Sequence, residues 1–159
     1  MDDIVFARAL HVLSLMHWIG GVAFVTLIAL PLAASRGGAD GLALFNAIER
    51  RFAAQVRFSI PLAGASGLWM TYRLDLWSRF ADPSFWWMSA MAGLWLLFMG
   101  VVFVVEPLFH EAFERRASAD PALALRRLTR AHRVLLLAAA LTVCGAVAGA
   151  QGVNLFARG

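Results

Sequence analysis

Long apolar stretches separated by shorter polar ones are the main pattern of this chain. Four windows are long enough to cross about 30 Å of hydrocarbon as helices at about 1.5 Å per residue, namely 9–32, 58–77, 84–105 and 134–156. Helices satisfy their own backbone N–H and C=O groups, which a lipid environment requires. The pattern therefore predicts an all-α fold, an integral membrane four-helix bundle that forms a single transmembrane domain over residues 1–159.

The polar segments between these windows also have helical patterns. Asp40 is placed to cap a helix whose apolar residues recur among polar ones up to Val56. That helix is either an amphipathic helix at the lipid headgroups or an extension of the second span. Asp120-Pro121 is typical of a helix start and predicts a helix that runs directly into the fourth span. We therefore expect short amphipathic cytoplasmic helical segments, with the third and fourth helices projecting beyond the bilayer.

Composition supports a membrane protein and sets its orientation. Hydrophobic residues make up 61% of the chain and charged residues 15%, which is not typical of a soluble domain. All fourteen basic residues are arginine, and most lie in the loops 33–56 and 109–133. In a soluble chain this charge would suggest nucleic acid, but here it fits the positive-inside rule, so we expect no nucleic-acid partner. The bias predicts a multi-pass protein of the bacterial inner (cytoplasmic) membrane, with both loops cytoplasmic and both termini periplasmic.

Two histidines in the first window are the main chemical signal. His11 and His17 lie in a stretch that has no charged residue from Ala9 to Ser35. An ionisable ring inside a membrane must find a partner and therefore indicates a functional site. The two histidines lie about 120° apart around the helix, so they do not chelate one ion between them. The structural alternative is an imidazole that hydrogen-bonds to a carbonyl or hydroxyl group across the bundle.

Other residues near these histidines extend the candidate site. Gly20 and Gly21 follow His17 by one turn and leave room for a flat macrocycle or for a neighbouring helix. Arg8 and Arg73 lie toward the outer boundary together with His11, where guanidinium groups suit haem propionates or an anionic quinone headgroup. The alternative for both arginines is a simple anchor at the interface.

A second polar group lies at the inner face. Glu106, His110 and Glu114 recur at four-residue spacing, and His132 begins the fourth span at a similar depth. This spacing suits a divalent metal or a proton relay, but the many nearby arginines favour ordinary salt bridges. Pro107 is expected to bend or break the helix within the group.

Small residues indicate how the helices approach one another. They occur in the second and fourth spans at the spacing of small-xxx-small motifs, which serve helix packing or a homodimer equally. The single cysteine lies mid-membrane and forms no disulfide. The small residues are Gly64, Ser66, Gly67, Gly145, Gly149 and Gly152, and the cysteine is Cys144.

The first window carries a family resemblance. Arg-Ala-Leu-His at 8–11 followed by Trp-Ile-Gly-Gly at 18–21 resembles the opening helix of CopD-like copper-resistance membrane proteins and of HemJ-type protoporphyrinogen oxidases. The similarity covers mainly 8–32, with a looser likeness over 126–149. It implies a membrane protein of four or more helices, and the HemJ type implies b-type haem with His11 as a ligand. HemJ-type enzymes also use a lysine, and this chain has none. The chain is also similar to uncharacterised bacterial four-helix membrane proteins.

Together these features predict a b-type haem protein with a redox or electron-transfer role. His11 and His17 are the axial-ligand candidates, Arg8 and Arg73 the propionate partners, and Trp18 packs beside the ring. The partners are the lipid bilayer, a second copy or a larger membrane complex, and a quinone. One alternative is copper handling or transport with soft methionine ligands, and the other is a non-catalytic accessory subunit of a membrane complex. No catalytic residue is assigned, and the methionines are Met16, Met70, Met88 and Met91.

Overall fold

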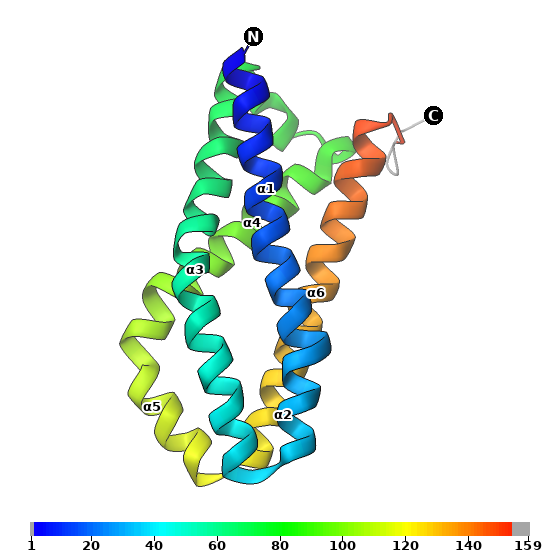
Figure 1. Ribbon diagram of the computed structural model, residues 1–159. Helices are drawn as coiled ribbons and strands as arrows, with labels where there is room; N and C mark the ends of the chain where they lie inside the picture. Colours follow the sequence, from blue (N-terminus) through cyan, green and yellow to red (C-terminus); the bar gives the residue numbers. More distant parts are fainter. Residues whose placement is uncertain (1, 154–159) are drawn as a thin grey trace.

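The computed structural model describes residues 2–153, which form helices joined by short connections, with no strand among them. The first long segment consists of α1 (Asp2–Phe24), a π-helical turn (Val25–Ala29) and α2 (Leu30–Arg36) in direct succession. A sharp turn at Gly37, whose φ of 70° is in the left-handed region, reverses the chain. The second segment, α3 (Gly38–Arg73), then runs back antiparallel to the first (Figure 1).

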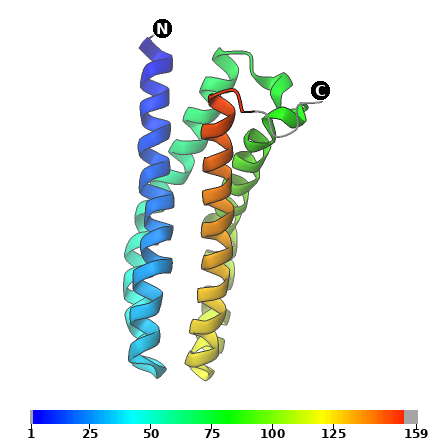
Figure 2. The ribbon, with the colours of Figure 1, turned by 90° about the vertical axis from the view of Figure 1, so that its right-hand side faces the viewer.

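The other two segments complete an antiparallel bundle. Two short 3-10 turns, Trp77–Phe80 and Pro83–Phe85, lead into α4 (Trp86–Gly100). The helix continues through a π-helical turn (Val101–Val105) into α5 (Glu106–Ala119), and the chain then reverses into α6 (Pro121–Ala150). The start of α1 and the end of α6 lie at the same end of the bundle, which we call the terminal end (Figures 1 and 2). The opposite end, which holds both sharp reversals, is called the turn end.

Both π-helical turns lie immediately before a proline. Val25–Ala29 precedes Leu30-Pro31, and Val101–Val105 precedes Glu106-Pro107. Proline has no N–H and its ring clashes with the carbonyl four residues earlier, so a wider turn relieves both problems. The helix therefore continues through each proline. At Pro107, where a bend or break was expected, the helix has a π-helical turn just before the proline. After this turn α5 diverges from the bundle, and none of its residues is buried (Figure 1).

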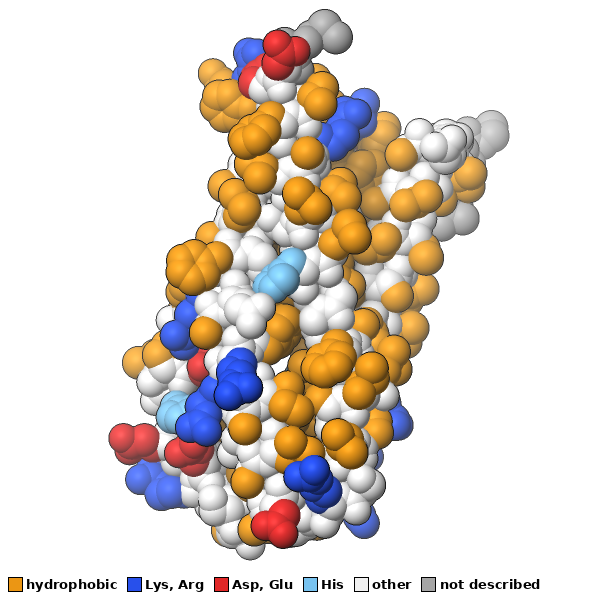
Figure 3. Space-filling model, viewed as in Figure 1, with side chains coloured by type: hydrophobic (Ala, Val, Ile, Leu, Met, Phe, Trp, Pro, Cys, Tyr) orange, Lys and Arg blue, Asp and Glu red, His pale blue; other side chains and the backbone are white. Residues whose placement is uncertain are grey.

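Three of the helical segments are long and apolar enough to cross a membrane. They are Asp2–Arg36, Pro83–Ala119 and Pro121–Ala150, and an 18-residue stretch within each has a mean hydropathy of 1.9, 2.3 and 2.0, respectively. The remaining segment, α3, carries charged residues along its half nearer the turn end. Figure 3 shows apolar side chains spread along the whole length of the visible surface, with many of the charged groups gathered at the turn end. An apolar exterior of this extent fits hydrocarbon surroundings rather than water.

The segments pack through a small core and through aromatic rings seated on glycines. A core cluster is formed by Trp18, Val22, Val56, Ile60, Ala63 and Val102. Three tryptophans of α4 occupy space that a side chain on the facing helix would fill, since a Cβ there would collide with the indole ring. The three pairs are Trp95 on Gly64, Trp86 on Gly145 and Trp87 on Gly149. These small residues therefore serve packing within the chain.

Most element boundaries agree with the sequence predictions, and three do not. Residues 38–57 form one continuous helix with the second apolar window, and Asp120 caps α6 by accepting a hydrogen bond from the Leu123 N–H at 3.0 Å. Asp40 does not cap α3, because the helix begins one turn earlier, after Gly37. The helix over the second apolar window ends at Arg73 rather than at 77, because the chain leaves the helix at Leu74 and Asp75 takes a φ of 49°. The predicted window 134–156 also extends too far, because α6 ends at Ala150. Residues 154–156 of that window lie outside the described residues.

Candidate functional site

His11 is held against α3 by a bond to the backbone. Its Nδ1 lies 2.8 Å from the carbonyl oxygen of Ala63 and 3.3 Å from Oγ of Ser66. The hydroxyl of Ser66 is close to the carbonyl of Leu62, at 2.6 Å, and donates its hydrogen there. The ring also lies over Gly67, where an added Cβ would be 3.1 Å from Cε1 of His11. The half-buried imidazole is therefore fixed at one nitrogen and packed along one edge.

This contact determines the tautomer of His11. A carbonyl oxygen can only accept a hydrogen bond, so Nδ1 must carry the proton and donate to Ala63. Nε2 of the neutral ring then has a free lone pair. Within residues 2–153 no hydrogen bond to this second nitrogen occurs. The arrangement is the one by which proteins orient a histidine whose other nitrogen binds a metal.

His17 differs from His11 because both of its nitrogens have partners. Nδ1 lies 3.1 Å from Oγ of Ser59, and Nε2 lies 3.2 Å from Oε1 of Gln55. An amide oxygen accepts, so Nε2 carries the proton and Nδ1 accepts from the serine hydroxyl. The ring lies on the exposed side of the α1–α3 contact. His17 is therefore a polar link between two helices and has no free lone pair.

The two glycines after His17 differ in their surroundings. The ring of Phe52 on α3 fills the space beside Gly21, where an added side chain would collide with it. Nothing lies within 4 Å of the position that a Cβ on Gly20 would take. The sequence predicted space beside Gly21 for a macrocycle or for a neighbouring helix, and a neighbouring helix occupies it.

Trp18 lies inside the bundle, with 5% of its surface exposed. Its ring packs edge-to-face against Phe98, with the centroids 4.9 Å apart. It also lines an apolar cavity of about 30 Å³ between α1, α4 and α6, together with Met91 and Thr142. A space of this size holds one or two water molecules and no macrocycle. Trp18 is therefore a core residue, and the interior of the single chain has no room for haem at this position.

The two arginines near the terminal end also differ. Nε of Arg73 donates to Oδ2 of Asp3 at 2.7 Å, and its guanidinium lies 5.9 Å from the ring centroid of Trp69. Arg8 is exposed, precedes His11 by one turn on the same helix, and makes no ion pair in the part of the chain that the structure describes. Of the two predicted propionate partners, Arg8 is thus the one with an unengaged guanidinium.

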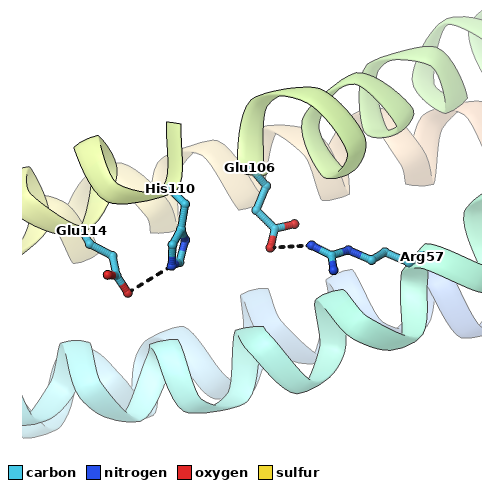
Figure 4. A network of polar contacts seen from close by, with 4 residues as sticks. All are labelled: Arg57, Glu106, His110 and Glu114. Atoms are coloured by element: carbon cyan, nitrogen blue, oxygen red, sulfur yellow. Dashed lines mark hydrogen bonds and ion pairs between the residues drawn. The ribbon is translucent and has the colours of Figure 1, made fainter. Parts of the chain in front are cut away.

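The second polar group, near the turn end, is a set of ion pairs (Figure 4). Arg57 of α3 lies 3.2 Å from Glu106, which links α3 to α5, and His110 lies 3.4 Å from Glu114 one turn along. His132 is elsewhere, with Nδ1 3.0 Å from the carbonyl of Leu128 and its ring against Phe45. No three potential metal ligands converge in residues 2–153. The salt bridges favoured by the sequence are present, and the four predicted residues do not form one site.

Glu49 joins this group and was not predicted. Burial, followed by the nearby carboxylate of Glu106, raises the pKa of Glu49, while His110, Arg50 and Arg57 oppose that rise. The sequence also gave no prediction for the groups on α3 that hold the two histidines. Gln55, Ser59 and Ser66 lie at i, i+4 and i+11 on one face of α3, so a polar stripe was the signal for these side chains. The backbone carbonyl of Ala63 has no such signal in the sequence.

Comparisons with models of protein families, with curated proteins and with solved structures gave no match. The functional conclusion consequently rests on the geometry of the chain itself.

Proposed function

We propose that this chain is a membrane-embedded b-type haem protein with a redox role, and that His11 supplies one axial nitrogen through Nε2. The observation that carries the proposal is the 2.8 Å hydrogen bond from Nδ1 of His11 to the carbonyl of Ala63. It fixes the tautomer, limits rotation of the ring and raises the basicity of Nε2. Among the described histidines of the apolar spans at the terminal end, His11 alone has one ring nitrogen held by a hydrogen bond and the other without a partner.

The residues present fit a haem with one histidine ligand and do not fit a bis-histidine haem inside one chain. His17 has both nitrogens engaged, and the cavity beside Trp18 is about 30 Å³. The macrocycle would therefore lie outside the single-chain core, where Arg8 can hold a propionate. Of the two histidines in α1, only His11 would hold the haem, and any further protein ligand would come from a second copy of the chain. When bound, the haem supplies one-electron chemistry, which the protein tunes through its axial nitrogen.

A copper site is the second candidate, and one placement favours it. Met70 lies one turn from Gly67, on the same side of α3, and Gly67 lies beneath the ring of His11. A thioether and an imidazole together suit Cu(I). Metal analysis of the purified protein separates this candidate from haem, because only haem adds a Soret band.

We further propose that the bundle spans the bacterial inner membrane with all four segments, including α3. The start of α1 and the end of α6 would then face the periplasm, and the arginine-rich turn end would face the cytoplasm. The apolar exterior of three helices supports a membrane location. The apolar half of α3, residues 58–73, is long enough to cross most of the core, and Arg57 and Arg73 lie at its two limits.

The proposal is tested by comparing four single variants purified in mild detergent after expression with ample haem. His11→Ala is expected to lose the Soret band or shift it markedly, while His17→Ala keeps the spectrum. Arg8→Gln is expected to retain haem less well on washing, whereas Arg73→Gln behaves like the wild type because Arg73 already pairs with Asp3. The proposal is wrong if the His11→Ala protein is monodisperse and carries the wild-type spectrum.

A further inference from the structure

Three arginines on α6 form a charged surface that the haem proposal does not use. Arg126, Arg130 and Arg133 lie at i, i+4 and i+7, within about 60° of one another around the helix. All three are exposed, and none of them has an ion pair in the described part of the chain. We call these three residues the arginine stripe.

Within residues 2–153 no carboxylate pairs with this stripe. No aspartate or glutamate occurs in residues 121–150, so pairing along α6 is excluded. The carboxylate of Asp120, just before the helix, accepts from the Leu123 N–H at 3.0 Å and caps the helix. Three arginines thus share one face of α6 near the turn end without an ion pair in the described part of the chain, and a bound anion would relieve the repulsion between their charges.

An exposed apolar track continues the stripe along the same face of α6. Val134, Leu137 and Leu141 are 62%, 61% and 57% exposed, and they follow the arginines toward the terminal end within a sector of about 100°. The opposite face of α6 is buried, with Leu125 and Ala139 at 4% and 5% exposure. Figure 2 shows α6 at the front of the molecule with no other helix in front of it. Charge and apolar surface therefore meet on one open helix face.

We infer that this face of α6 is a binding site for an anionic phospholipid of the leaflet at the turn end. The guanidinium groups of the stripe bind the phosphate oxygens, for which their planar fork is suited, and the acyl chains lie along the apolar track. A soluble phosphate or a nucleic acid would bind the arginine stripe and leave the apolar track exposed. The combination of charge and apolar track is what favours a phospholipid. The inference requires that α6 cross the membrane and is independent of haem.

The test uses native mass spectrometry of the full chain in neutral detergent, titrated with dioleoylphosphatidylglycerol or with dioleoylphosphatidylcholine. The wild type is expected to bind the anionic lipid preferentially. The stripe variant, with Arg126, Arg130 and Arg133 all changed to Gln, is expected to bind it about a hundredfold more weakly. A control variant removes the same charge from exposed arginines elsewhere at the turn end, with Arg50, Arg51 and Arg116 changed to Gln, and it is expected to bind like the wild type.

Two competition experiments show whether the site recognises the whole phospholipid or only its phosphate group. Glycerophosphoglycerol, which has the headgroup without acyl chains, and inorganic phosphate are expected to compete poorly for the site. The inference fails if the control variant loses as much affinity as the stripe variant, because the effect is then general charge. It also fails if inorganic phosphate displaces the lipid at equal concentration, or if the stripe variant, shown to be folded by circular dichroism, binds like the wild type.

Discussion

Nδ1 of His11 lies 2.8 Å from the carbonyl oxygen of Ala63, and this contact distinguishes His11 from His17 on the same helix. His17 is bonded at both nitrogens by side chains of α3. Two residues that look equivalent as intramembrane histidines therefore have different chemical capacities. His11 keeps a lone pair for a ligand, whereas His17 joins two helices.

His17 is expected to stabilise the α1–α3 contact without affecting any cofactor. Removing its ring leaves the hydroxyl of Ser59 without this partner, and hydrogen bonds between membrane helices contribute about 0.6 kcal/mol each. His17→Ala, Ser59→Ala and the double variant form a cycle that is read from unfolding free energies in detergent. We expect a coupling free energy of about 0.6 kcal/mol. Strictly additive losses would show that this hydrogen bond contributes nothing.

Helix positions followed from the sequence because apolar periodicity and capping residues are local signals. Asp120-Pro121 marked the start of α6 correctly, since an aspartate cap needs only the N–H groups that follow it. The end of α3 was misplaced by four residues, because the turn depends on the backbone of Asp75, which has a φ of 49°. A non-glycine residue in that conformation has little signature in sequence.

The contacts of the candidate site were less accessible from the sequence. The sequence shows that His11 and His17 need polar partners, but which groups form hydrogen bonds to them depends on the register of α1 against α3. Arg73 could equally be a free cation or a partner of Asp3, and only the meeting of the two helix ends shows the ion pair. The haem, the copper and the membrane topology stay predictions.

Gly64 is expected to be sensitive to any side chain, because the indole of Trp95 occupies that space and its N–H donates to the carbonyl of Ile60 at 2.9 Å. Gly64→Ala should destabilise the protein by about 1–3 kcal/mol through overpacking. Gly93→Ala is the matched control, because nothing lies within 4 Å of a Cβ there. It should be neutral or stabilising, since alanine is favoured over glycine in helices. Equal thermal midpoints for the two variants would contradict the packing of Trp95.

Glu49 is expected to make stability fall as pH rises. Burial and the carboxylate of Glu106 raise the pKa of Glu49 above its ordinary value of 4.5. The folded protein therefore binds this proton more tightly than the unfolded chain, and stability decreases as pH rises from that ordinary value through the folded-state pKa. Thermal midpoints of the wild type and of Glu49→Gln between about pH 4.5 and 8 measure the effect. We expect the wild-type midpoint to fall relative to the variant, whereas parallel curves would contradict the assignment.

The orientation of the chain is expected to follow its arginines. Nine arginines lie in the loops 33–56 and 109–133, which meet at the turn end. An alkaline phosphatase reporter fused after Arg158 should be active, as a periplasmic reporter is. The same reporter inserted between Ala117 and Asp120 should be inactive. A reporter that works only in the cytoplasm should be active at that site. If the alkaline phosphatase reporter were active only in the loop, the topology would be the reverse of the predicted one.

The most direct test of the central claim is chemical rescue of His11. The reduced-minus-oxidised spectrum of the wild-type protein should show a Soret band and an alpha band. The His11→Gly protein should lack both, and added imidazole should restore them by taking the vacated position near the carbonyl of Ala63. A wild-type protein that is monodisperse and colourless after expression with ample haem would contradict the claim, and so would a His11→Gly protein that keeps the full spectrum without imidazole.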